Sequence, residues 1–137
     1  MTLQLAVAVR NALLDAIESN TGTSAILKIY DLTAGAPADC AAAITGTVLV
    51  TMPLPSDWMN DAAGGVKTLA GTWTDTSADD SGTADFFRIF KTDGTTCQMQ
   101  GTVTATSGGG DMEIDNVVIA AGQTVTVTTF SLTAPNA

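Results

Sequence analysis

The segment DNVVIAAGQTVTVTTFSLT, residues 115–133, constrains the fold of this chain more than any other. It predicts a strand, a glycine turn and a second strand whose alternation of apolar and polar residues changes phase midway. Val125 and Val127 share one face of the second strand, whereas Phe130 falls on the opposite parity. Because side chains along a strand alternate with period two, the slip at Thr128-Thr129 predicts a β-bulge or a strand that crosses between two packed sheets.

Other apolar runs, separated by turn residues, predict further strands. We expect strands over residues 25–31, 47–52 and 66–74, followed by a hairpin over residues 85–106. Short strands with turns between them are typical of antiparallel folds, whereas a parallel sheet would need helices between its strands. The chain is therefore expected to be mainly β: an antiparallel, jelly-roll-like β-sandwich of seven or eight strands, preceded by one helix.

The hairpin over residues 85–106 can pair in two registers. A two-residue loop would place Arg88 beside Met99, whereas a three-residue loop would place Phe87 opposite Met99. We expect the three-residue loop, because it gathers the apolar side chains on one face, where a one-residue slip would be penalised by burial. The residues expected on that face are Phe87, Ile89, Cys97, Met99 and Val103.

Residues 3–19 predict an amphipathic helix. Its apolar ridge consists of residues four apart, namely Leu5, Val9, Leu13 and Ile17. Such a ridge needs to be buried, either against the sheets of the same chain or against another subunit, and the charged residues are expected to cover the remaining faces. The single domain is thus divided into an N-terminal helical part, 1–22, and a β-sandwich, 23–137.

The charge of the chain argues against several partners. The formal net charge is −9, and the five basic residues do not cluster, so no surface for a nucleic-acid backbone is predicted. An anionic membrane would repel such a surface. Residues 1–18 lack a basic start and are interrupted by polar residues, so neither a secretion signal nor a membrane span is predicted. The acidity fits either attraction to a basic partner surface or simple solubility.

Residues that usually carry catalysis are scarce. The chain has no histidine, which removes the usual general base, the nucleophile–histidine dyads and the commonest zinc ligand. No enzymatic activity is therefore expected. The two cysteines, Cys40 and Cys97, are either buried thiols or a disulfide, because the sequence does not establish their separation in space.

Two smaller groups are candidate sites. Asp111, Glu113 and Asp115 alternate along a strand and form a weak candidate for calcium, although the central glycine and later glutamate of a calcium loop are missing. A solvated strand face is the preferred interpretation, so no metal and no cofactor is predicted. The second group is a proline-flanked tryptophan that could anchor a partner, formed by Pro53, Pro55 and Trp58.

Three segments together resemble the capsid cement, or decoration, proteins of tailed bacteriophages. They are VRNALLDAIESNTGTSAILKIYD at residues 9–31, LPSDWM at residues 54–59, and DNVVIAAGQTVTVTTFSLTA at residues 115–134. The resemblance implies a β-sandwich that binds the outside of an assembled head and bridges neighbouring capsid subunits. It also implies neither an enzymatic role nor a cofactor.

The expected function is therefore that of a virion protein on the capsid surface, made in the host cytoplasm. Its expected partners are the major capsid protein and further copies of itself, with a dimer expected ahead of a trimer. The residues expected at the contacts are Leu5, Val9, Leu13, Pro53, Pro55 and Trp58. The alternatives are a tail-tip, baseplate or fibre component, and a carbohydrate-binding β-sandwich module.

Overall fold

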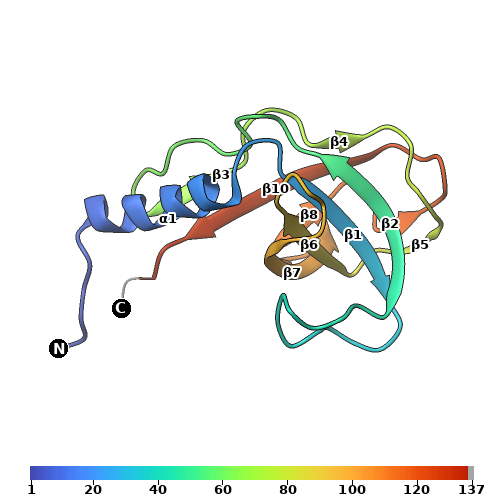
Figure 1. The fold of residues 1–137 in the computed structure, drawn as a ribbon, viewed down its shortest axis with the longest axis horizontal. Helices are drawn as coiled ribbons and strands as arrows, with labels where there is room; N and C mark the ends of the chain where they lie inside the picture. Colours follow the sequence, from blue (N-terminus) through green and yellow to red (C-terminus); the bar gives the residue numbers. More distant parts are fainter. Residues whose placement is uncertain (136–137) are drawn as a thin grey trace.

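The computed structural model describes residues 1–135 and is mainly β, with one helix near the N-terminus (Figure 1). The helix is α1 (Val7–Thr21). The strands are β1 (Ile26–Leu32), β2 (Gly46–Pro53), β3 (Val66–Thr68), β4 (Thr74–Asp75), β5 (Gly82–Thr83), β6 (Phe86–Phe90), β7 (Cys97–Ala105), β8 (Met112–Ile114), β9 (Val118–Ile119) and β10 (Val125–Thr133). The expected mainly β class with one N-terminal helix is confirmed.

Eight strands form one curved sheet in the order β2-β1-β6-β7-β8-β10-β3, with β4 also paired to β10, and β5 and β9 form a small second sheet. Because β2 lies against β4 as well as β1, the main sheet folds over in a sandwich-like arrangement around the core. The expectation of purely antiparallel pairing is wrong at one place, since β7 and β8 are parallel. Parallel neighbours usually need a long crossover, but β8 has only three residues, so the loop 106–111 suffices to return the chain.

Strand β10 contains the predicted bulge. Val127 pairs with Ile114 of β8 and Thr129 pairs with the preceding residue, Glu113, so Thr128 is an extra residue in β10. The bulge shifts the parity of the strand, and Phe130 therefore enters the same core as Val127, with 3% and 4% of their surfaces exposed. One strand thereby pairs with β4, β8 and β3 in succession along its length.

The expected strand over residues 66–74 is divided in two. Its ends form β3 and β4, which pair with opposite ends of β10. Between them Gly71 has a φ of +69°, a conformation that L side chains rarely adopt, and the chain turns there. Alternation alone could not reveal this turn, because the apolar residues on either side of Gly71 both pack against the core.

The hairpin of β6 and β7 has neither expected register. Phe87 pairs with Gly101 and Ile89 with Met99, so the expected pairing of Phe87 with Met99 is wrong. The loop is longer than either expectation, because the Asp93 carboxylate accepts the backbone N–H groups of the two residues that end it and so stabilises a wider turn. The hydroxyl of Thr96, followed by the N–H groups of Thr96 and Thr95, lowers the pKa of Asp93 to about 2.

The core is organised around four aromatic side chains. Trp73 lies between the other rings, with its centroid 6.0 Å from Trp58 and 5.4 Å from Phe130, and Phe87 meets Phe130 edge-on at 5.7 Å. Trp58 is completely buried. Such tilted and edge-on contacts are the favoured arrangements of aromatic pairs.

The outer side of β6 is covered by the long loop between β1 and β2. The disulfide between Cys40 of that loop and Cys97 of β7 joins residues whose Cα atoms are 5.5 Å apart, which decides between the two cysteine states left open by the sequence. Arg88 of β6 donates hydrogen bonds to the carbonyls of Asp39 and Ala42 in the same loop, each 2.8 Å long. Gln100 of β7 also donates to the Pro37 carbonyl of the loop at 2.9 Å. The loop is therefore fixed by the disulfide and these three hydrogen bonds, and all five residues of β6 are buried.

Candidate interaction surface

Helix α1 packs against the strands through its polar side. Arg10 donates to the Ala134 carbonyl, and Asn11 accepts the Gly65 N–H at 2.8 Å. One turn further along, Asp15 accepts the Ala62 N–H at 3.0 Å. The expectation that charged residues cover the solvent side of the helix is therefore wrong, because backbone groups of residues 59–65 and of the chain's end require partners that these side chains supply.

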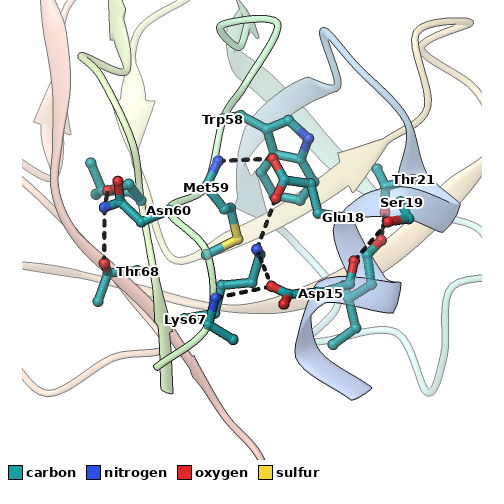
Figure 2. A network of polar contacts seen from close by, with 12 residues as sticks. Asp15, Glu18, Ser19, Thr21, Trp58, Met59, Asn60, Lys67 and Thr68 are labelled. Atoms are coloured by element: carbon teal, nitrogen blue, oxygen red, sulfur yellow. Dashed lines mark hydrogen bonds and ion pairs between the residues drawn. The ribbon is translucent and has the colours of Figure 1, made fainter. Parts of the chain in front are cut away.

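Lys67 is the centre of this contact (Figure 2). Its side chain is only 1% exposed, and its Nζ lies 2.7 Å from Asp15 Oδ1 and 2.9 Å from Glu18 Oε2. Glu18 also accepts the backbone N–H of Met59, 3.1 Å away. The ammonium thus has two carboxylates around it, and the helix is held at this point by a three-residue ionic cluster.

The charges of this cluster depend on each other. Burial opposes the charged form of Lys67, but its hydrogen bonds to Asp15 and Glu18 raise the pKa above the usual lysine value. The hydrogen bond from Lys67, followed by the N–H of Ala62, lowers the pKa of Asp15. Both groups are therefore charged near neutral pH, and the cluster stabilises the docked helix.

The outer side of α1 is apolar and open to solvent. The exposed fractions there are 46% for Val9 and 50% for Leu13. Val7, the first residue of the helix, is 52% exposed but lies two turns before the buried Leu14, on the other side of α1. The charged residues of the helix, Arg10, Asp15 and Glu18, all bond to the strands or to Lys67. We call the exposed residues Val9 and Leu13 the outer helix face; it combines apolar character with an absence of charge, which is typical of protein contact surfaces.

Residues 1–6 form an extended arm ahead of this face. The helix begins at Val7 rather than at residue 3, and Ala6 has extended backbone angles. The arm carries the most exposed large apolar side chains of the described residues, Met1 and Leu3, the latter 85% exposed. Leu5 is half-buried and lies in the arm, so it does not continue the ridge of Val9 and Leu13.

The loop behind the two prolines is not an anchor of the expected kind. Trp58 is completely buried, and its indole N–H donates to the Gly22 carbonyl at 3.0 Å, so this tryptophan has no surface left for a partner. Pro53 is exposed at the end of β2, and Pro55 is half-buried. The structure does not bring Trp58 together with the outer helix face: the tryptophan belongs to the core beneath the helix.

The three carboxylates of the calcium candidate already bind backbone groups. Asp111 accepts the Thr102 N–H, and Glu113 accepts two N–H groups of the loop 106–111, which lower its pKa. Asp115 accepts the Thr126 N–H. Within residues 1–135 no group of three acidic, cysteine or histidine side chains is arranged to hold a metal ion. The alternation of these residues thus reflects loop and strand capping.

A cavity of about 160 Å³ lies at the surface beside the start of β8. Its lining residues are Phe87, Met99, Gln100, Asp111, Phe130, Ser131 and Leu132. Next to Gln100, Gly101 allows Phe87 and Asp111 to approach the backbone of β7 closely: a Cβ atom there would lie 2.8 Å from the Phe87 ring and 2.8 Å from the Asp111 carboxylate. The only sequence signal for this cavity is a glycine inside a strand, which often marks close approach of another group.

The fold and the surface together define a mainly β domain with a helix that docks through its polar side and exposes its apolar side. Comparison with protein-family models, curated proteins and solved structures gave no match. No helix among residues 1–135 is long and apolar enough to span a membrane.

Proposed function

We propose that this chain is a non-enzymatic virion structural protein, a capsid cement protein that binds the outside of a tailed-phage head and stabilises contacts between major capsid protein subunits. The observation that supports the proposal is the outer helix face. Its two apolar side chains, Val9 and Leu13, are about half exposed on a helix whose position is fixed from the other side. A rigid apolar surface of this kind is suited to being covered by another protein.

The energetics of such a contact fit a protein that acts in many copies. Fully burying an aliphatic side chain contributes about 1.5–3 kcal/mol, so covering two half-exposed side chains contributes roughly 2 kcal/mol. That is too little for tight binding by one copy, because association itself has a large entropic cost. Copies that are linked to each other, or that bridge neighbouring subunits, gain avidity without new contacts.

The location of the chain in phage particles tests this proposal. Particles from a culture that encodes the chain would be labelled with antibody against it and imaged by electron microscopy. We expect label over the surface of the head. Label confined to the tail would favour a tail-tip, baseplate or fibre component instead, and intact particles without label would overturn a virion role.

The outer helix face is tested by point variants. Val9→Gln and Leu13→Gln should weaken attachment to particles while changing the free energy of unfolding by less than about 0.5 kcal/mol, because both side chains are exposed. Val118→Gln is a matched control, since Val118 is also exposed but lies on β9. Deletion of the helix is unsuitable for this purpose, because its polar side bonds to residues 59–67. Equal attachment of all the variants would exclude this face.

A further inference from the structure

The main sheet contains a position where half a strand is missing. Strand β8 lies between β7 and β10, but it begins at Met112, opposite Val103 and Phe130. Beyond that point β7 continues toward Cys97 and β10 continues to Thr133 with no described strand between them. The cavity of about 160 Å³ lies in this gap, which we call the slot.

Backbone groups of β10 face the slot. The Phe130 carbonyl accepts the Leu69 N–H and the Ala134 N–H donates to Gly65, so even-numbered residues bond on the β3 side. Since backbone groups alternate along a strand, the N–H and C=O groups of Ser131 and Thr133 point the other way, into the slot.

Backbone groups of β7 face the slot from the opposite side. The Val103 N–H donates to Asp85 on the β6 side, whereas the Thr102 N–H donates to Asp111 on the β8 side. The same alternation directs the N–H and C=O of Gln100 into the slot. Both walls are thus open strand edges, of the kind to which an extended peptide can add.

The floor of the slot is apolar. Phe87 and Phe130 meet there, and Met99 and Leu132 lie at its sides. An inserted strand would therefore place every second side chain on an apolar floor and the others toward solvent. Such an occupant needs alternating apolar and polar residues.

The N-terminal arm has that pattern. Residues 1–7 alternate, with Met1, Leu3, Leu5 and Val7 on one parity and Thr2, Gln4 and Ala6 on the other. The arm is extended, and Leu3 is 85% exposed. It leaves the left end of α1 in Figure 1, and the N-terminus lies well apart from β7 and β8, which border the slot.

We propose that the slot receives the N-terminal arm of a second copy of this chain, with Leu3 on the floor formed by Phe87 and Phe130. Residues 1–6 contain no charged side chain, so they can approach a chain of net charge −9 without repulsion between like charges. Beyond the end of the pairing with β8, β10 continues only to Thr133, so an added strand would be about as short as β3 and β8, which have three residues each. Association by this contact is therefore reversible and depends on concentration.

A site-specific crosslink tests the proposal with the purified full-length chain. A diazirine amino acid replaces Leu3 in unlabelled protein, which is mixed with ¹⁵N-labelled unmodified chain, irradiated and analysed by mass spectrometry. We expect crosslinks from position 3 to residues 99–101 and 131–133 of the labelled chain. The same diazirine at Val118, another exposed apolar position, is the matched control and should not react there.

Light scattering provides a second measurement. Leu3→Asp should raise the dissociation constant for self-association at least tenfold, and Val118→Asp should not change it. Crosslinks within one chain, crosslinks to the open edge of β2, or a chain that stays monomeric at every concentration would each overturn the proposal. The inference goes beyond the proposed function, and because its test contains no particle, it can fail while the labelling of phage heads succeeds.

Discussion

Removal of the disulfide should destabilise the protein through its unfolded state. The bond between Cys40 and Cys97 closes a loop with a sequence separation of 57 residues. A loop of that length restricts the entropy of the unfolded chain by about 14 cal/mol/K, which corresponds to about 4 kcal/mol at 25 °C. Arg88 should hold the covering loop in place without the bond, because its two hydrogen bonds to that loop remain. The loss should therefore approach the entropic value.

The assay is urea unfolding of Cys40→Ser/Cys97→Ser against the parent chain, followed by the fluorescence of the buried Trp58 and Trp73. We expect a free energy of unfolding lower by about 3–4 kcal/mol, a large part of the stability of a domain of this size. The fluorescence of the folded state should not change. A loss below about 1 kcal/mol, or a folded state with altered tryptophan fluorescence, would refute an effect that acts on the unfolded chain.

Three further predictions concern the helix cluster and the bulge. Lys67→Met should lower the free energy of unfolding, measured by urea titration, by about 2 kcal/mol. This value is near the low end for the loss of a buried charge pair, because Asp15 is 44% exposed. An unchanged urea midpoint would contradict the role of the cluster. Asp15, with its lowered pKa, contributes stability above pH 3.8 that is lost as the pH falls through its folded pKa. Lys67, with its raised pKa, contributes stability below pH 10.5 that is lost as the pH rises through its folded pKa. Urea midpoints measured against pH should fall at both ends, and the alkaline fall should be smaller in Lys67→Met, where only groups such as the buried Tyr30, whose pKa is also raised, still contribute to it. Deletion of Thr128 should turn Phe130 out of the core and lower the free energy of unfolding, measured by thermal denaturation, by at least about 3 kcal/mol. Thr128→Ala keeps the bulge and should lower it by about 1 kcal/mol or less. Equal losses in the two variants would contradict the role of the extra residue.

The features that could be predicted from the sequence are those set by local periodicity. The bulge at residues 128–129 can be predicted because the apolar residues of the strand occupy one parity before these residues and the opposite parity after them. The hairpin register could not be predicted in the same way, since it depends on the hydrogen bonds of the Asp93 carboxylate in the turn. The pairing of Cys40 with Cys97 needs a distance in space that no pattern of residues supplies.

The orientation of α1 was beyond prediction for a different reason. Its pattern shows which face is apolar, and the usual expectation is that the apolar face is buried. The outcome is reversed, because the neighbouring segment offers unpaired N–H groups at Met59, Ala62 and Gly65 and a buried lysine, Lys67. Acceptors on the helix satisfy these groups, and only Leu14 is a deeply buried apolar side chain of α1. The orientation of α1 is therefore determined by residues 59–67, which are distant from the helix in the sequence.

The docked helix also determines how the protein behaves when it is crowded. Residues 59–65 run beside β3 through two isolated bridges and form the last backbone on that side of the sheet. An outermost backbone with free N–H groups is a template on which further chains can add and grow into fibrils. Side chains of α1 occupy the N–H groups of Met59, Ala62 and Gly65, and a side chain cannot propagate a ladder to the next molecule. The helix thus prevents fibril growth from this side at high local concentration.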